Sequence, residues 1–128
     1  MDKREIKFRA WVKPNYYNNG GYMIEWEAIN NIGKDHIRVP LQGEVNNQFD
    51  MLGLKDVELM QYTGLKDKNG VEIYEGDIVY VAGYGNMCVV FSHAAWALES
   101  KKELIFFNEC EDMERVIGNI HENPELLK

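Results

Sequence analysis

Two cysteines and two histidines are the residues of this sequence that most resemble a metal-binding set. They are Cys88, His93, Cys110 and His121. Structural zinc sites usually draw their ligands from closely spaced pairs, whereas here cysteine and histidine stand five and eleven positions apart. Cys88 also lies in an apolar run, where a cysteine serves as a small core residue. The spacing therefore predicts no metal site. Free thiols are expected because a chain with this many core residues needs no disulfide and shows no export signal, and no cofactor is expected.

Two groups of acidic residues raise the question of magnesium-dependent chemistry. The first is Glu72, Glu75 and Asp77, and the second is Glu109, Glu111, Asp112 and Glu114. Paired carboxylates can hold Mg²⁺ for phosphoryl transfer. Neither group has a basic residue or histidine beside it with a readable catalytic role. We therefore interpret both groups as solvated surface.

A nucleophile would need an activating base within hydrogen-bond reach. Ser92 and His93 are neighbours in sequence, and on a regular strand adjacent side chains face opposite ways. The sequence also lacks a Gly-x-Ser-x-Gly motif, a phosphate-binding glycine loop and a His-Glu-x-x-His motif. We therefore predict that the protein is not an enzyme.

The basic start of the chain is the candidate for binding a partner or nucleic acid. Alternation over residues 4–13 predicts a strand with Ile6, Phe8, Ala10 and Val12 on its buried face. The opposite face then carries Lys7, Arg9, Trp11 and Lys13. Cations beside an aromatic ring are typical of surfaces that bind single-stranded nucleic acid. The alternative is an ordinary basic strand face on which Trp11 packs against a neighbour.

The net charge of the 128 residues is −7, and 45% of them are apolar. This composition predicts one compact soluble unit with a real core, and it contains no apolar run long enough for a membrane span. Residues 1–43 carry seven bases and five acids (+2), and residues 44–128 carry seven bases and sixteen acids (−9). The acidity argues against coating DNA by bulk charge. The simplest explanation of the asymmetry is a solvated surface; the alternative is contact between the basic start and the acidic end, within one chain or between copies.

We expect the first part, residues 1–56, to form an N-terminal hairpin and an irregular connecting segment. The first strand ends at Pro14, and a loop at Asn18–Gly21 leads to a second alternating run at Tyr22–Ala28. Glycine, proline and asparagine interrupt residues 29–47, where a short strand is expected around His36–Leu41. Phe49–Leu52 suggests a helical turn, and the conformation of residues 29–56 is otherwise left open.

Residues 57–128 predict a small β-barrel, because short apolar runs alternate with strong turn signals. The expected strands are Val57–Thr63, Val71–Tyr74, Ile78–Val81, Met87–Phe91, Ala94–Leu98, Leu104–Phe107 and Arg115–Ile120. A terminal helical turn is expected at Pro124–Leu127, with proline in its first position. The Gly-Asp-Ile-Val start at Gly76 is typical of SH3-like barrels. The fold class is thus mainly β, an SH3-like or related partly open barrel with little helix.

Three separated blocks of the sequence carry a resemblance to a known family. They are REIKFRAW at Arg4–Trp11, MQYTGLKDKNG with EIYEGDIV between Met60 and Val79, and VIGNIHENPELL at Val116–Leu127. In this order the chain resembles the YopX family of phage and prophage proteins. The resemblance implies a bacteriophage or prophage origin, a location in the bacterial host cytoplasm and self-association. It implies no established biochemical activity.

From these observations the sequence predicts a non-enzymatic phage accessory protein that forms a homo-oligomer and acts through contacts with phage or host proteins. The central block consists of turn residues and core residues, a combination that specifies a fold and not a reaction. The alternative function is single-stranded nucleic-acid binding through Lys7, Arg9, Trp11 and Lys13. No membrane partner is expected.

Overall fold

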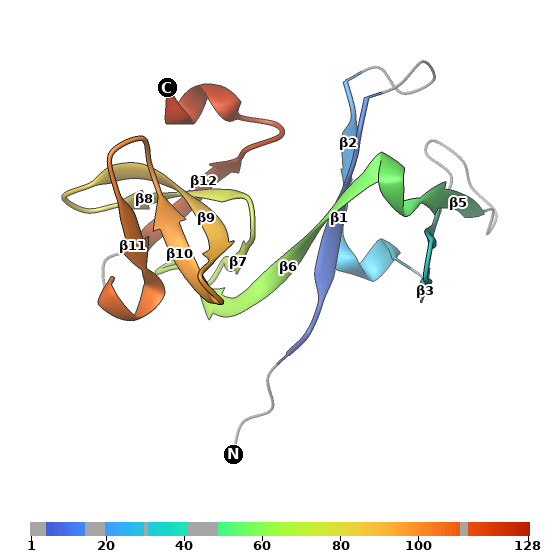
Figure 1. The fold of residues 1–128 in the computed structure, drawn as a ribbon, viewed down its shortest axis with the longest axis horizontal. Coiled ribbons are helices and arrows are strands. Elements are labelled where there is room, and N and C mark those ends of the chain that lie inside the picture. Colours follow the sequence, from blue (N-terminus) through green and yellow to red (C-terminus); the bar gives the residue numbers. More distant parts are fainter. Residues whose placement is uncertain (1–4, 15–19, 30, 41–48, 111–112) are drawn as a thin grey trace. The chain divides into compact units, whose positions relative to one another are not determined.

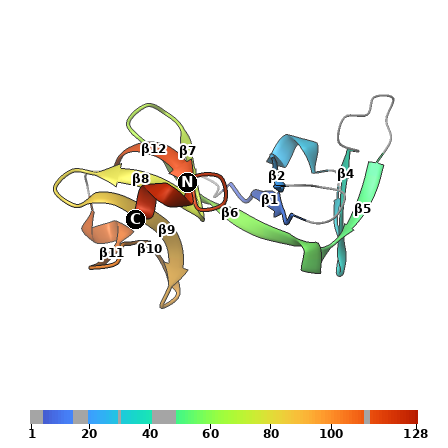
Figure 2. The same ribbon diagram turned by 90° about the horizontal axis from the view of Figure 1, so that it is seen from above.

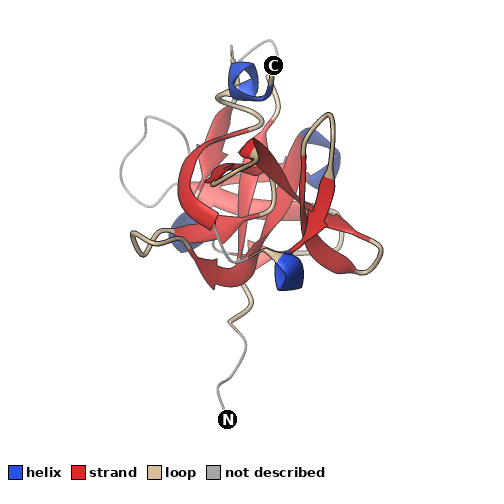
Figure 3. Ribbon diagram, turned by 90° about the vertical axis from the view of Figure 1, so that its left-hand side faces the viewer, coloured by secondary structure: helices blue, strands red, loops and turns tan. Residues whose placement is uncertain are grey.

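The computed structural model describes residues 5–14, 20–29, 31–40, 49–110 and 113–128. Over these ranges the chain is mainly β, which confirms the predicted fold class, and its helices are short 3₁₀ turns (Figures 1 and 3). Contacts divide the chain into an N-terminal unit, Lys7–Met60, and a C-terminal unit that includes Gln61–Lys128. The division falls four residues after the predicted boundary at 56/57. No described helix has the length and apolar character needed to cross a membrane.

The N-terminal unit contains two small antiparallel sheets. In the first, β1 (Phe8–Val12) lies between β2 (Tyr22–Ile24) and the long strand β6 (Val57–Lys66). In the second, β4 (His36–Pro40) lies between β3 (Asn31–Ile32) and β5 (Phe49–Gly53). The short turns η1 (Trp26–Ala28) and η2 (Leu54–Asp56) complete the unit. Its buried core consists of Ala10, Val12, Ile24, Ile37 and Val57.

Two local predictions for this unit are wrong. The second alternating run ends as a strand at Ile24, and Trp26–Ala28 forms the 3₁₀ turn η1. Phe49–Leu52 is not a helical turn, because it belongs to β5 and pairs along the whole of β4. Pairing with a strand about a dozen residues away in sequence outweighs the weak local preference. The predicted strand around His36–Leu41 is present as β4.

The C-terminal unit contains an antiparallel five-stranded sheet in the order β11-β10-β9-β8-β12, and its strands curl into a half-barrel (Figures 1 and 2). Its strands are β8 (Asp77–Val81), β9 (Gly85–Ser92), β10 (Ala95–Glu99), β11 (Leu104–Phe106) and β12 (Met113–Asn119). The second half of β6 pairs with β7 (Glu72–Tyr74). The turns η3 (Phe107–Glu109) and η4 (Pro124–Leu127) follow β11 and β12. Every strand expected after Val57 is present, and η4 has the predicted bounds; the SH3-like topology stays a prediction.

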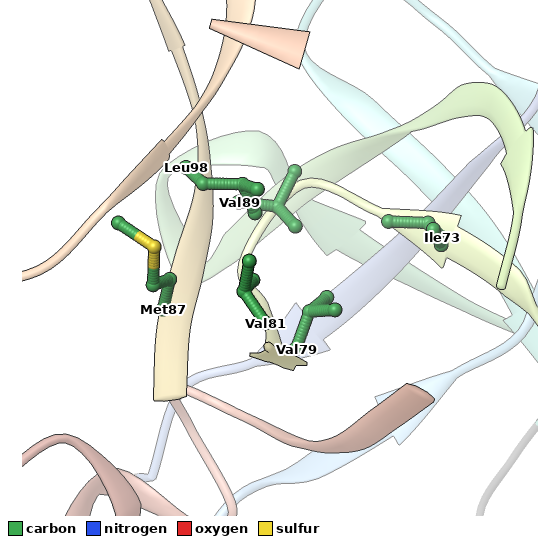
Figure 4. Packing of buried hydrophobic residues seen from close by; sticks show 6 residues of the cluster. All are labelled: Ile73, Val79, Val81, Met87, Val89 and Leu98. Carbon is green, nitrogen blue, oxygen red and sulfur yellow. The ribbon is translucent and has the colours of Figure 1, made fainter. Parts of the chain in front are cut away.

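The core of the C-terminal unit is aliphatic. Alternate residues of β8 and β9 point inward, as their period of two requires. The fully or almost fully buried members are Ile73, Val79, Val81, Met87, Val89 and Leu98 (Figure 4). Burial of this many apolar side chains stabilises the sheet on one face.

Candidate functional site

Asp67 is a buried carboxylate that binds backbone N–H groups on both sides of a turn. Its Oδ1 accepts hydrogen bonds from the N–H groups of Asn69 (2.8 Å) and Val71 (2.9 Å), and its Oδ2 accepts one from Val116 in β12 (2.8 Å). Burial by itself would raise the pKa of this carboxyl, but the three N–H donors together hold the pKa below its usual value. The arrangement fixes the turn that ends in Gly70 to β12. The Asp67 carboxylate therefore serves to hold the backbone.

Asn119, in the last of the resemblance blocks, also holds backbone. Its Oδ1 accepts hydrogen bonds from the N–H groups of His121 (3.0 Å) and Glu122 (2.9 Å), and its Nδ2 donates to Glu122 Oε1 (2.8 Å). The neighbouring Gly118 is required for space, because a Cβ there would lie 2.5 Å from Asn123 Oδ1. These polar side chains shape the chain between β12 and η4.

In the first acidic group, two carboxylates also accept hydrogen bonds from backbone N–H groups. Asp77 is almost fully buried and its Oδ2 accepts a hydrogen bond from the N–H of Tyr74 (2.7 Å). Glu75 Oε1 lies 3.5 Å from the N–H of Gln61, and Glu72 stands opposite Lys66 in the β6–β7 ladder. In the second group Glu109 is exposed on η3, whereas Glu111 and Asp112 lie outside the described residues. Among the described residues, no three His, Cys, Asp or Glu side chains gather in a way that could hold a metal ion.

The predicted basic face of β1 is not an open surface. Lys7, Arg9 and Trp11 are all buried, and only Lys13 is exposed, with its Nζ donating to the carbonyl of Lys55 (3.2 Å). The expectation of a single buried face is therefore wrong for this strand. The physical reason is that side chains and backbone of the same unit also cover the second face of β1, where Arg9 lies against Met60 and Trp11 against Gly21.

Two contacts show how these side chains are accommodated within the N-terminal unit. Arg9 Nη2 lies 4.0 Å from the Sδ of Met60. The ring of Trp11 occupies the space over Gly21, where a Cβ would approach within 2.5 Å of Cζ2. Whether Lys7, Arg9, Trp11 and Lys13 contact a partner stays a prediction, and the burial of three of them removes its original basis.

Both cysteines are free thiols. Cys88 lies buried in β9 and contributes to a groove of about 460 Å³ together with Val90, Glu99, Ser100, Lys101, Ile120 and Leu127. Burial raises the pKa of the Cys88 thiol to about 11, and the carboxylates of Glu99, Asp77 and Glu75 act in the same direction. A thiol in this state is a poor nucleophile and a poor metal ligand at neutral pH.

The structure corrects the prediction that Ser92 and His93 cannot meet. Ser92 Oγ lies 2.8 Å from His93 Nδ1, because His93 and Ala94 have positive φ angles (53° and 62°) in the tight turn between β9 and β10. The strand alternation used for the prediction ends at that turn. The pair is exposed to solvent, so water competes for both groups. The His93 ring contacts Phe106 edge-on, with centroids 6.2 Å apart.

Next to this turn lies an apolar groove of the C-terminal unit that sequence reasoning missed. A groove of about 530 Å³ is formed where the end of β6, the start of β10 and the chain from β11 into η3 meet. We call it the aromatic groove; its lining residues are Thr63, Leu65, Ala95, Trp96, Phe106, Phe107, Asn108 and Glu109. No local sequence pattern marks this groove, because Thr63 and Leu65 lie thirty or more positions before the other lining residues.

Apolar side chains at the aromatic groove remain exposed after folding. Leu65 is 44% exposed, and Phe91, which packs edge-on against Trp96 with centroids 5.0 Å apart, is 56% exposed. A cluster of exposed aromatic and aliphatic groups beside a concave surface is characteristic of interaction sites.

Comparison with known proteins identifies one family over nearly the whole chain. The family model described as YopX protein matches residues 7–128. The crystal structure of protein EF1440 from Enterococcus faecalis is similar, with 29% identity, a TM-score of 0.63 and coverage of 98% of this chain and 100% of that one. YopX from Bacillus subtilis has 21% identity, a TM-score of 0.63 and 95% coverage of each chain, and this likeness concerns the fold. No curated protein matches.

Proposed function

Because the chain belongs to the YopX family, we propose that it is a non-enzymatic protein-interaction module of bacteriophage or prophage origin that works as a homo-oligomer in the cytoplasm of the bacterial host. The observation that carries this proposal is that certain polar side chains of the C-terminal unit are buried while certain large apolar side chains are exposed. Asp67, Asp77 and Asn119 are buried and hold backbone, whereas Leu65 and Phe91 are exposed. The three buried polar side chains are thus engaged in hydrogen bonds to backbone, whereas the two exposed apolar side chains can contact another molecule.

The charge asymmetry supports the self-association part of the proposal. The net charges of residues 1–43 (+2) and residues 44–128 (−9) favour attraction between copies, even with Lys7 and Arg9 buried, and such attraction weakens as salt screens it. We rank single-stranded nucleic-acid binding below this function. Three of its four predicted contact residues are buried, and the C-terminal unit from Gln61 carries six bases against twelve acids.

Sedimentation velocity of the full chain at about 20 mM and about 500 mM salt tests the proposal, because the Debye length shrinks severalfold over this range. We expect a species larger than the monomer at low salt and a shift toward the monomer at high salt. A monomer at both salt concentrations would overturn self-association. Catalytic turnover of any small substrate by the purified chain would overturn the non-enzymatic part.

A further inference from the structure

We propose that the aromatic groove binds an extended, basic segment of a different protein, one in which lysine or arginine alternates with aromatic or large aliphatic residues. This proposal rests on the proposed function, since it names the surface and the partner chemistry of the interaction module. It does not depend on self-association.

The dimensions and lining of the groove fit an apolar anchor residue. Its volume of about 530 Å³ falls within the range of roughly 300–1,000 Å³ that is usual for pockets that hold a ligand. Trp96, Phe106 and Phe107 supply aromatic surface, and Thr63 and Asn108 supply polar groups at the same place. An aromatic or aliphatic side chain placed here gains contact area and edge-to-face packing.

An extended backbone suits this position because the groove adjoins a sheet edge. β11 stands at the end of the strand order in the five-stranded sheet, and its last residue, Phe106, lines the groove. A strand at an edge presents N–H and C=O groups with which another chain can pair. Alternate side chains of an added strand point to one side, so every second residue of the partner reaches the groove.

The charge of the surroundings selects a basic partner. Glu109 is exposed and lines the groove, and residues 61–128, to which all the lining residues belong, carry six bases against twelve acids. Of the bases, Lys66 next to Leu65 stands opposite Glu72 in the β6–β7 ladder, and Lys101 and Lys102 lie at the other end of the β10–β11 hairpin from Ala95 and Phe106. A nucleic acid or an acidic peptide would meet the net negative charge of this unit, whereas a lysine or arginine of the partner would meet the Glu109 carboxylate.

The test is fluorescence anisotropy with a fluorescein-labelled hexapeptide in which lysine alternates with phenylalanine and valine, titrated with the full chain at about 50 mM salt. Two control peptides replace every lysine by glutamate or the phenylalanine by serine. We expect saturable binding of the first peptide only. Leu65→Ser should weaken binding about tenfold through lost apolar contact, and Glu109→Lys about fivefold through charge reversal.

Matched variants outside the groove are Val71→Ser, at an apolar residue that is 48% exposed, and Glu125→Lys, at an exposed carboxylate of η4. Both should bind the peptide as the wild-type chain does. Far-ultraviolet circular dichroism of all four variants checks that the fold is intact.

Several outcomes would overturn the assignment. Equal binding of the lysine and glutamate peptides, or an unchanged affinity in Leu65→Ser and Glu109→Lys, would remove the groove as the site. Tighter binding of an oligothymidylate probe than of the peptide would make the ligand a nucleic acid. A change in the sedimentation coefficient of the free chain in Leu65→Ser would make the occupant a second copy. Salt-dependent oligomers without peptide binding would leave self-association standing and overturn this inference alone.

Discussion

The turn around Asp67 and the aromatic groove belong to the same unit, yet they differ in which kind of side chain is buried and which is exposed. At the turn, a charged group is buried and its oxygens accept three backbone N–H groups. At the groove, large apolar groups such as Leu65 and Phe91 remain in contact with solvent. Only one residue, Lys66, separates Leu65 from Asp67 in the sequence. The difference teaches that adjacent positions of one sequence block can serve stability and binding separately.

This separation explains why a highly recognisable sequence block says little about activity. A buried carboxylate that holds a turn tolerates few replacements, since an unsatisfied N–H group is costly. An exposed apolar residue contributes little to folding, and where several lie together beside a concave surface they are typical of a site for contacts with other molecules. The predictions below test this contrast between buried polar groups and exposed apolar ones.

The largest expected effect concerns the Cys88 thiol. With a pKa of about 11, it carries more than about a hundredfold less thiolate at pH 8 than an ordinary thiol with a pKa near 8.5. In the Cys110→Ser variant, which retains Cys88 alone, we expect very slow reaction with a thiol reagent in the native state. The rate should rise about tenfold per pH unit up to the pKa. Full reaction in denaturant serves as the control, and fast native labelling would contradict the burial of Cys88.

Asp67→Asn should destabilise the fold by about 2–3 kcal/mol at pH 7. The amide N–H₂ would face backbone donors, and hydrogen bonds to a charged acceptor are worth more than neutral ones. Because the folded-state pKa of Asp67 lies below its unfolded value, this stabilisation is present above about pH 4 and is lost as the pH falls further. Urea unfolding at pH 7 and pH 3 measures both effects.

The matched control for Asp67→Asn is Asp35→Asn, at an exposed carboxyl of the N-terminal unit, for which we expect a change of at most about 0.5 kcal/mol. A difference between wild type and Asp67→Asn that stays equal at both pH values would contradict the role of the ionised carboxylate.

Asn119→Ala should destabilise by about 1–2 kcal/mol, because it removes the acceptor for the N–H groups of His121 and Glu122. The same urea titration measures it. Asn108→Ala, at an exposed amide, provides the comparison and should change stability within about 0.5 kcal/mol. If the two variants were equally stable, the Asn119 side chain would not hold the chain after β12.

The smallest effect on stability is expected at the exposed apolar residues. Phe91→Ser should change the free energy of unfolding by less than about 1 kcal/mol, since more than half of the side chain is already in solvent. Val89→Ser, two residues away on the same strand and almost fully buried, should cost several times as much. Thermal unfolding monitored by circular dichroism compares the two. Comparable losses would mean that Phe91 belongs to the core.

Much of the C-terminal unit could be predicted because its turns are encoded locally. Asn69-Gly70 and Gly76-Asp77 indicate chain reversals on either side of β7, and the apolar runs that follow them predict the strands β8 and β9. The helical turn at Pro124–Leu127 follows in the same way from proline. Local chemistry and tertiary structure agree in this part of the chain.

The errors arise where distant pairing or a turn decides the outcome. β5 becomes a strand through its ladder with β4, and the second face of β1 is covered by contacts such as Arg9 with Met60 and Trp11 with Gly21. Ser92 and His93 meet because positive φ angles end the alternation of β9. The aromatic groove combines residues of β6, β10 and η3, and a single sequence holds no signal for that combination.

The ten-residue strand β6 begins in the N-terminal unit and ends in the C-terminal unit, so the boundary between Met60 and Gln61 falls within a strand. A genetic crossover at the boundary between Met60 and Gln61 would cut through a strand that both units use. Neither half is therefore suited to exchange as an independent cassette, and a limited protease would find no interdomain loop at this boundary. In evolutionary terms the two units are expected to be inherited together.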